Sequence, residues 1–528
     1  MITYRCNETD KGQKNMKLAF AEQIRKIDSF AINTLGIPAE ALMGRSGSEV
    51  AREVRSLSGI GDRVVILAGK GNNGGDGYAA ACELLADRDV LVYDVFSAGQ
   101  RSPEGNHYLS LYKSLGGRVL PLEIDDGFVS NIKGAAVIVD AIFGTGASGN
   151  IPEHFLSLSE IIEGSSAKIV AVDVPLGVNA DDGSVCDGAL AADVTVALSY
   201  LKPGLLSYPA KAICGRVVLD TIGLPSDIVE KNIEFKNHLF DFASAVASLP
   251  DRPDNSSKGT FGRALLITGS REYTGAGLLT LEAALRGGAG YVTHICTPEE
   301  KATYLLKFPE VIYRADLNDG GYDTEGIKAL SGQSASTLIG SGSGVSEGLA
   351  DLVCELIAGE GSPLVIDADA INSIAKYKSR EVLLKAKRRI ILTPHPLEFS
   401  RLSGIPLEEI RKNRISVAKT FAKKYGVILV LKGAATLTTD GEHLYINSSG
   451  SSALAKAGSG DVLAGLLSSV LAYHKEPLVA SALSVYLHGL AGDNLSEELS
   501  CFGVTPSDLP VEISRIMRKI EKSKGELI

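Results

Sequence analysis

Short runs of β-branched and apolar residues alternate with segments long enough for a helix along almost the whole chain. In the first half these runs are apolar at every position, which is typical of strands buried on both faces of a parallel sheet. The alternation predicts repeated strand–helix–strand units, and therefore an α/β fold with a doubly wound sheet. We expect these strands at residues 63–68, 90–96, 135–142, 168–174 and 193–199, after a helical lead-in at 16–58.

The rhythm weakens between residues 223 and 262, where a GLPSD turn is followed by a polar stretch. This composition predicts a boundary near residue 225, and hence two domains, 1–225 and 226–528. A hairpin that turns at Asp440-Gly441 and a mostly helical segment from about 458 should complete the second domain. Its other strands are expected at 263–268, 291–296, 336–340, 363–367, 389–393 and 427–431.

Composition excludes several classes of protein. With 528 residues, 45% apolar and 22% charged, the chain should form two to four ordinary globular domains. A net charge of −10 argues against a broad nucleic-acid or anionic-membrane surface. The seven cysteines form no C-x-x-C pair, and no stretch resembles a secretory signal or a membrane span. We therefore expect a cytoplasmic protein.

The strongest local feature of the first half is the segment GKGNNGGDG at residues 69–77. It follows the first expected strand, opens a helix and matches G-x-G-x-x-G, with Asp94 near the end of the next strand. Such a loop either binds phosphate through its backbone N–H groups or forms a tight turn without a ligand. Asn72, Asn73 and Asp76 add side-chain oxygens that suit a hard cation or ribose hydroxyls.

Two more polar loops follow expected strands of the first half. Asp140 precedes the loop at 144–150, and Asp173 ends another strand. Each aspartate alone is as readily a cap or a turn residue. Because the carboxyl ends of parallel strands meet at one sheet edge, the three loops together predict a shared binding site.

In the second half, the segment AGSGD at residues 457–461 opens an apolar helix. Backbone N–H groups at a helix start attract an anion, and Asp461 could take a proton from a hydroxyl beside a phosphate. The other interpretation is a capped helix with small residues for close packing. The G-x-x-x-x-G-K-[ST] pattern is missing, so a P-loop ATPase is excluded.

Further motifs of the second half end strands as well. Lys432 begins the loop KGAAT, which is suited to approaching a nucleotide. His395 lies between two prolines at a strand end, where a functional role is favoured over a purely structural one. Segments 340–344 and 367–372 complete the set of loops at this sheet edge.

The loops of the first half resemble the YjeF N-terminal family of NAD(P)H-hydrate epimerases over about residues 16–225. The matching segments are GKGNNGGDG, VDAIFGTGASG, VDVPLGVNADDG, LKPG and GRVVLDTIGLP. The resemblance implies a Rossmann-like fold, with Asp173 as the acid or base at the epimerised carbon. It implies that the hydrated cofactor is bound by Asn72, Asn73, Gly74, Gly75, Asp76, Gly144, Thr145, Gly146, Ala147, Ser148, Gly149, Asn150 and Asp173.

The same resemblance implies a potassium ion held by Asn73, Asp140 and Leu176. The family often has PSG where this chain has PLG, so Leu176 can offer only its backbone carbonyl. The frequent family segment MENAG is replaced here by MGRSG at residues 43–47.

The second half is similar to the ribokinase-like superfamily, and more closely to its ADP/ATP-dependent NAD(P)H-hydrate dehydratases, over about 256–500. The matching segments include KGTFGRALLITGS, IDADAIN, TPHPLEF, KGAAT and AGSGDVLAG. The resemblance makes Asp461 the catalytic group and places the hydrated nicotinamide near Ala276, Gly277, Gly342, Gly344, His395 and Asp461. It places the nucleotide phosphates at Lys432, Gly433, Ala434, Ala435, Thr436, Gly458, Ser459 and Gly460.

Together these resemblances imply a bifunctional metabolite repair enzyme. The first domain would interconvert the R and S hydrates of NADH and NADPH. The second would dehydrate the S form with ADP (or ATP), Mg²⁺ assisting, and release AMP and phosphate. A homo-oligomer is also implied. The alternative is a ribokinase-like kinase for a small alcohol, such as a hydroxymethyl-pyrimidine or thiazole, with a non-catalytic N-terminal ligand-binding domain.

Overall fold

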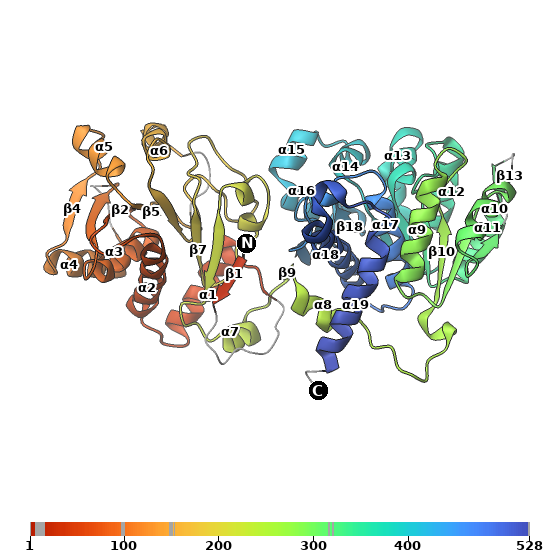
Figure 1. Ribbon diagram of the computed structural model, residues 1–528, viewed down its shortest axis with the longest axis horizontal. Coiled ribbons are helices and arrows are strands. Elements are labelled where there is room, and N and C mark those ends of the chain that lie inside the picture. Colours follow the sequence, from red (N-terminus) through yellow and green to blue (C-terminus); the bar gives the residue numbers. More distant parts are fainter. Residues whose placement is uncertain are drawn as a thin grey trace. The chain divides into compact units, whose positions relative to one another are not determined.

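The computed structural model describes residues 2–5, 16–96, 101–146, 151–152, 154–314, 317–318 and 321–525. The chain forms two compact units that change over between residues 235 and 236 (Figure 1). This point lies beyond the boundary expected near 225, because the intervening segment packs on the first unit. The Phe235 ring lies 4.8 Å from the ring of Tyr200, and Ile233 joins the same core.

The first unit is built on an eight-stranded parallel sheet with the order β1-β8-β7-β6-β5-β2-β3-β4. All five expected strands are present. β1 and β4 were not expected; both are four-residue strands at the sheet edges, and β4 is mostly exposed. β8 was also missed. The strands are β1 (Ile2–Arg5), β2 (Arg63–Ala68), β3 (Asp89–Asp94), β4 (Arg118–Pro121), β5 (Val137–Ala141), β6 (Lys168–Val172), β7 (Val194–Leu198) and β8 (Arg216–Asp220).

Helices cover both faces of this sheet, which explains the continuous apolar runs. Val64 and Ile66 of β2 belong to the core beneath α1, α2 and α3, whereas Val65 and Leu67 belong to the core beneath α5 and α6. The helices are α1 (Ala21–Asn33), α2 (Ala39–Leu57), α3 (Asn72–Leu84), α4 (Pro103–Ser114), α5 (Asp126–Lys133), α6 (His154–Glu163) and α7 (Ser226–Asn232).

The second unit contains a ten-stranded sheet with the order β12-β11-β10-β15-β16-β17-β18-β19-β20-β9. The expected strands and the β19–β20 hairpin are confirmed, and Asp440 Oδ1 accepts two backbone N–H groups at its turn. β9, in the polar lead-in, was not expected. The strands are β9 (Asn237–Phe240), β10 (Arg263–Ile267), β11 (Tyr291–Ile295), β12 (Ile312–Arg314), β15 (Ser336–Ile339), β16 (Leu364–Ile366), β17 (Ile390–Leu392), β18 (Ile428–Leu431), β19 (Leu437–Thr439) and β20 (Leu444–Asn447), beside the small hairpin of β13 (Leu317–Asn318) and β14 (Gly321–Tyr322).

The helices of the second unit surround this sheet and confirm the helical C-terminal segment (Figure 1). Nowhere in the described ranges is a helix long and apolar enough to cross a lipid bilayer. The helices are α8 (Phe242–Ser248), α9 (Thr274–Arg286), α10 (Pro298–Lys307), α11 (Thr324–Gly332), α12 (Glu347–Ala358), α13 (Ala368–Tyr377), α14 (Pro396–Ser403), α15 (Leu407–Lys412), α16 (Arg414–Tyr425), α17 (Ser459–Leu471), α18 (Pro477–Gly503) and α19 (Leu509–Gly525).

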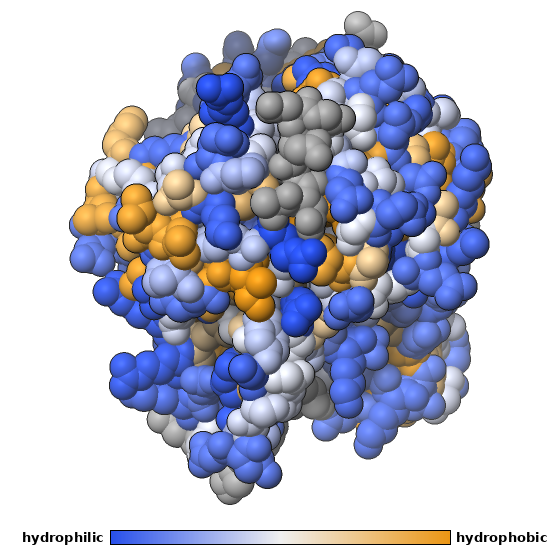
Figure 2. All heavy atoms as spheres, turned by 90° about the vertical axis from the view of Figure 1, so that its right-hand side faces the viewer, coloured by the Kyte–Doolittle hydropathy of each residue, from blue (hydrophilic) through white to orange (hydrophobic). Residues whose placement is uncertain are grey.

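Polar side chains cover most of the face that carries α10 and α11, with apolar patches between them (Figure 2). Leu305 and Leu306 of α10 and Ile312 of β12 are large apolar side chains exposed in this part of the unit. Scattered exposed apolar residues are normal for a globular protein, so they assign no function by themselves.

The start of α17 is held in place by its close packing against α9. A Cβ atom at Gly465 of α17 would lie 2.3 Å from the carbonyl oxygen of Thr280 in α9, so this position admits only glycine. The crossing brings the first turn of α17, which carries Asp461, next to the helix that carries Ala276 and Gly277.

We therefore predict that Gly465→Ala lowers the free energy of unfolding of the second unit by about 1–3 kcal/mol, the usual cost of overpacking. The matched control is Gly348→Ala in α12, where a Cβ would meet nothing within 4 Å. That substitution should raise stability by up to about 1 kcal/mol, because alanine favours helix. Calorimetry of both variants checks the pair. Equal thermal unfolding midpoints for the two variants would contradict the packing argument.

Candidate active sites

A cavity of about 690 Å³ lies at the carboxyl end of the first sheet. The sheet order places β2 between β3 and β5, so the chain turns to opposite sides after β2 and after β5. Such a switch point leaves a crevice between the following loops, where ligands bind in α/β folds. The loops after β2, β5, β6 and β7 line the cavity, and α1 and α2 supply much of the remaining wall.

Asp173 lies in this cavity and is paired with a fully buried lysine. Lys202 donates hydrogen bonds to the Asp173 carboxylate and to the carbonyl of Leu198, the latter at 2.6 Å. The backbone N–H groups of Thr145 and Leu198 donate to Asp173 at 3.2 and 3.3 Å. Asp173 also has a left-handed φ of 65°, which a non-glycine residue adopts only when its surroundings impose it.

Two further carboxyl groups line the same cavity. Burial, together with the charge of Asp173, raises the pKa of Asp76 well above its usual range, although the hydroxyl of Ser46 opposes the shift. Burial also raises the pKa of Asp28 to about 6, with Asp173 adding to the shift and Lys202 opposing it. The cavity therefore holds an ionised pair beside carboxyl groups that keep their protons more readily.

Asp140 and Asn73 form a buried polar corner near the same loops. Asp140 accepts the backbone N–H groups of Leu176 at 2.6 Å and Ile142 at 3.2 Å, and burial raises its pKa to about 6. The carbonyl of Leu176 accepts the N–H of Leu190 at 3.0 Å, which leaves it one lone pair. Within the described residues, the buried side-chain nitrogen of Asn73 has no hydrogen-bond partner.

The glycines of the first loop have different roles. Cβ atoms at Gly69 and Gly74 would lie 1.9 Å from the carbonyl oxygens of Ile142 and Gly69, so the chain's own packing requires both. Gly71 faces open space and lines the cavity. A Cβ at Gly144 would come within 3.2 Å of Asp173 Oδ2, so this position is tied to the site itself.

The structure brings most of the expected epimerase residues to one cavity. Gly74 and Gly75 lie inside α3 and do not line it; a Cβ at Gly75 would lie 2.5 Å from Met43. Ala147, Ser148, Gly149 and Asn150 lie outside the described residues. The expected residues that do line the cavity are Asn72, Asn73, Asp76, Gly144, Thr145, Gly146 and Asp173.

Lys202 and Asp28 are charged cavity residues that the sequence did not identify. Lys202 belongs to the LKPG segment, but a lysine in a motif does not reveal that it will be buried beside an aspartate 29 residues away. Asp28 interrupts the apolar face of an amphipathic helix, between Ile24 and Ile32. A polar residue on the buried face of a helix is the signal that could have identified it.

In the second unit, half-buried Lys432 lies close to two buried carboxyl groups. Its ammonium nitrogen is 3.2 Å from Asp367 Oδ1 and 3.9 Å from Glu398 Oε2. Burial lowers the pKa of Lys432, but these two carboxylates outweigh it, and the pKa is raised overall. A Cβ at Gly460 would lie 3.4 Å from the same nitrogen, so the first turn of α17 adjoins the lysine.

Asp461 shares this environment. Burial raises its pKa to about 7, with Asp367, Asp369 and Glu398 adding to the shift and Lys432 opposing it. Gly458, the N-cap of α17, has a φ of 98° that favours glycine. A carboxyl group with a pKa near neutrality at a helix N-terminus is suited to accepting a proton beside a bound anion.

The loops after β10 and β15 meet at the switch point of the second sheet. The N–H of Gly269 donates to the carbonyl of Ser341 at 2.8 Å. A Cβ at Gly342 would lie 2.5 Å from the Cβ of Ala276, so the two expected substrate loops are in contact. Gly344 N–H donates to Asp369 at 2.9 Å, which joins the loop after β16 to them.

His395 has a structural role that the sequence did not predict. Its ring Nδ1 accepts the N–H groups of Leu397 and Glu398 at 3.2 and 3.3 Å, while Glu398 Oε2 accepts the N–H of His395 at 2.8 Å. The residue thus caps α14. Burial and the charge of Lys432 lower the pKa of its ring, in accord with an unprotonated, accepting Nδ1. Its place in the substrate site stays a prediction.

Buried Arg414 shapes the expected nucleotide loop and was missed from sequence. Its guanidinium donates to the carbonyls of Leu431, Lys432 and Ala434 at 2.9–3.2 Å. Ala435 in this loop has a φ of 54°. Arg414 lies in the first turn of α16, so no local motif connects it with the loop that it stabilises.

In the parts of the chain that the structure describes, no three His, Cys, Asp or Glu side chains are grouped to hold a metal ion. Mg²⁺ is commonly bound by one or two carboxylates together with substrate phosphates and does not require such a group.

Comparison with known proteins gives two family matches in the order of the two units. The model described as YjeF-related protein N-terminus matches residues 39–204. The model described as NAD(P)H-hydrate dehydratase matches residues 264–515.

Curated relatives match over almost the full length. The bifunctional NAD(P)H-hydrate repair enzyme of Thermofilum pendens is 33% identical, covering 96% of this chain and 97% of its own. That of Moorella thermoacetica is 32% identical, with 97% and 99% covered. The solved ADP/ATP-dependent NAD(P)H-hydrate dehydratase of Bacillus subtilis is 28% identical and covers 53% of this chain and 98% of its own, with a TM-score of 0.48. The chain therefore belongs to the family of bifunctional NAD(P)H-hydrate repair enzymes.

Proposed function

We propose that this chain repairs hydrated NADH and NADPH in two steps. The first unit interconverts the R and S hydrates, and the second dehydrates the S hydrate with ADP, giving NAD(P)H, AMP and phosphate. One observation carries the proposal: each unit has, at the carboxyl end of its sheet, an aspartate whose charge is opposed by a lysine. These pairs are Asp173 with Lys202 and Asp461 with Lys432.

In the first unit, Asp173 accepts the proton of the hydroxyl on the hydrated carbon. Lys202 pairs with this carboxylate, and the N–H groups of Thr145 and Leu198 donate hydrogen bonds that fix its direction. Loss of that proton lets the carbon–oxygen unit become a carbonyl as the bond to the ring nitrogen opens. Closure on the other face of the carbonyl inverts the centre, and the proton returns from Asp173.

In the second unit, Asp461 accepts the proton of the hydroxyl, whose oxygen attacks the terminal phosphoryl group of ADP. AMP leaves, and the hydroxyl has become a phosphate ester. Phosphate then departs as the neighbouring carbon loses a proton, which restores the double bond. Lys432 and the N–H groups at the start of α17 stabilise the charge of the transferred phosphoryl group.

The residues near Asp461 suit Mg²⁺, and those near Asp140 suit potassium less fully. Around Asp461, the carboxylates of Asp367 and Glu398 exceed the single charge of Lys432, which suits Mg²⁺ carried by the nucleotide; that ion would neutralise phosphate charge. For potassium, Asn73 and Asp140 provide buried oxygens that a cation could share, whereas the Leu176 carbonyl is already hydrogen-bonded. No step above depends on potassium.

The alternative of a small-alcohol kinase with a non-catalytic first domain is disfavoured. The curated relatives match both units together, and the first cavity contains the paired carboxylate that a mere binding module does not need. The product separates the two functions, because a kinase leaves a stable phosphate ester and a dehydratase releases free phosphate with NAD(P)H. A cytoplasmic location, a homo-oligomer and the preference for ADP stay predictions.

We predict that Asp173→Asn and Asp461→Asn separate the two activities. With an R/S mixture of hydrated NADH, Asp173→Asn should restore absorbance at 340 nm only up to the S fraction, because an amide cannot accept the proton. Asp461→Asn should restore almost none, with the dehydration rate reduced about 10²- to 10⁴-fold, while still equilibrating R and S on a chromatographic assay.

Mixing the two variants should bring back full recovery, and this mixture serves as the control for folding. Full recovery by Asp173→Asn alone would overturn the role of the first unit. A phosphorylated product without NADH, made by the unmodified chain, would overturn the role of the second.

We also predict that kcat/KM of the dehydratase falls as the pH drops below about 7. Burial and the surrounding carboxylates raise the pKa of Asp461 to about 7, and only the ionised form can accept a proton. The rate should therefore rise tenfold per pH unit on the acid side and level off above neutrality. Rates at 340 nm from pH 5.5 to 8.5 with the pure S hydrate check this; a flat profile would contradict it.

A further inference from the structure

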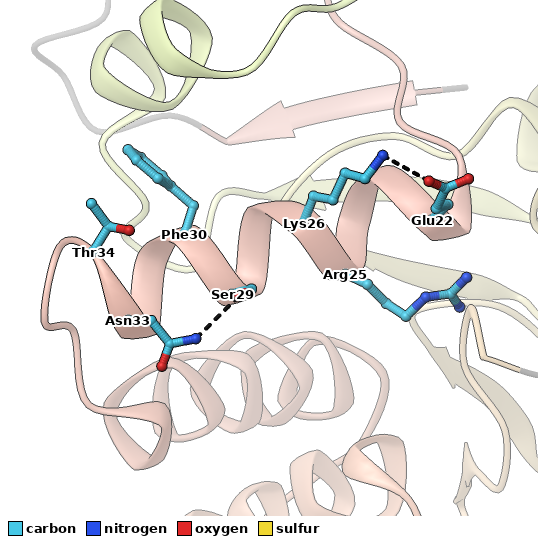
Figure 3. Close-up of a pocket in the computed structure, with 7 residues that line it drawn as sticks. All are labelled: Glu22, Arg25, Lys26, Ser29, Phe30, Asn33 and Thr34. Atoms are coloured by element: carbon cyan, nitrogen blue, oxygen red, sulfur yellow. Dashed lines mark hydrogen bonds and ion pairs between the residues drawn. The ribbon is translucent and has the colours of Figure 1, made fainter.

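α1 presents two chemically different faces. Ile24, Asp28 and Ile32, spaced one turn apart, line the cavity of the first unit. On the outward face, Lys26 pairs with Glu22 at 2.7 Å and Asn33 donates to Ser29 at 3.1 Å (Figure 3). These two outward pairs are bonded within the helix, whereas Asp28 lies between two isoleucines on the side that lines the cavity, which Arg25 also reaches.

Asp28 has no hydrogen bond or ion pair in the described part of the chain, although it is half-buried. A carboxyl group taken from water without a partner destabilises the fold, so such groups are usually paired. The neighbouring residues Ile24 and Ile32 are apolar, and an apolar side chain at position 28 would avoid this destabilisation. An unpaired carboxyl facing a cavity indicates that its partner is a ligand.

The charges around Asp28 set its proton affinity. Lys202 and Asp173 line the same cavity, Asp76 comes from α3, and Arg25 belongs to the same helix. Burial is the largest influence and raises the pKa of Asp28 to about 6. A carboxyl group with a pKa of about 6 gains and loses a proton near neutral pH. Asp173, in contrast, accepts a hydrogen bond from Lys202.

We propose that Asp28 is a second catalytic acid–base residue of the epimerase, in the same cavity as Asp173. The inference rests on the proposed function and adds to it the group that serves the ring nitrogen of the hydrated nicotinamide. It explains why a helix outside the strand-end loops contributes a polar residue to the site.

Asp173 and Asp28 together account for every proton that moves during ring opening and closure. Asp173 takes the hydroxyl proton while protonated Asp28 gives its proton to the ring nitrogen, the carbon–nitrogen bond breaks, and its electron pair stays on nitrogen. The opened chain carries a carbonyl. On closure, nitrogen attacks the other face, Asp28 takes its proton back and Asp173 returns the proton to oxygen. No oxidant, reductant or third reactant is needed.

The test is Asp28→Asn in the full-length protein, with pure R hydrate as substrate and chromatographic measurement of the S hydrate formed. We expect kcat/KM for epimerisation to fall about 10²- to 10⁴-fold, the usual contribution of a general acid. Asp28→Glu should recover part of this loss. In the unmodified protein, kcat/KM for epimerisation should fall at alkaline pH, where Asp28 has lost its proton. This fall should disappear in Asp28→Asn.

Two controls separate this role from a structural one. Dehydration of the pure S hydrate by the second unit should be unchanged in Asp28→Asn. Glu22→Gln, on the outward face of the same helix, should leave both activities unchanged. Equal epimerisation by Asp28→Asn and the unmodified protein would overturn the inference alone. No epimerisation above the uncatalysed rate by the unmodified protein would overturn the proposed function of the first unit itself.

Discussion

Both sheets are covered by helices on their two faces, and this constraint governs where chemistry can occur. Side chains within the strands are used for packing, as Val64 and Val65 show by entering opposite cores. Polar groups can gather only at strand ends, and the order of the strands decides which ends diverge. In the first unit, divergence after β2 and β5 opens the cavity that holds Asp173.

Within that frame, both sites tune an aspartate by the same balance of forces. Burial favours the neutral carboxyl group, and a nearby lysine favours the carboxylate. The balance differs between the sites. Lys202 bonds directly to Asp173, whereas Lys432 bonds to Asp367 and acts on Asp461 through space, among further carboxylates. Direct pairing gives Asp173 a fixed hydrogen-bond partner, whereas the crowded arrangement raises the pKa of Asp461 to about 7.

Much of the fold and part of each site could be predicted from sequence, because the information is local. Strands that are buried on both faces give continuous apolar runs in the sequence, and the glycine-rich loops that follow them give recognisable motifs. The edge strand β4 is exposed and short, so it has no such pattern. Lys202, Asp28 and Arg414 could not be assigned, because their roles come from burial against distant segments. His395 lies in a recognisable motif, but the motif does not reveal that its ring caps α14.

The two units have separate cores but share one chain. Joining them fixes the stoichiometry of the two catalysts at one to one, whatever the level of expression. An isomerisation that only equalises two diastereomers draws no energy of its own and is pulled forward by the irreversible step that consumes one of them. A constant ratio of the two catalysts therefore prevents the unusable diastereomer from accumulating when the nucleotide-driven step is fast. Linkage in one polypeptide is a way to regulate flux without a regulatory site.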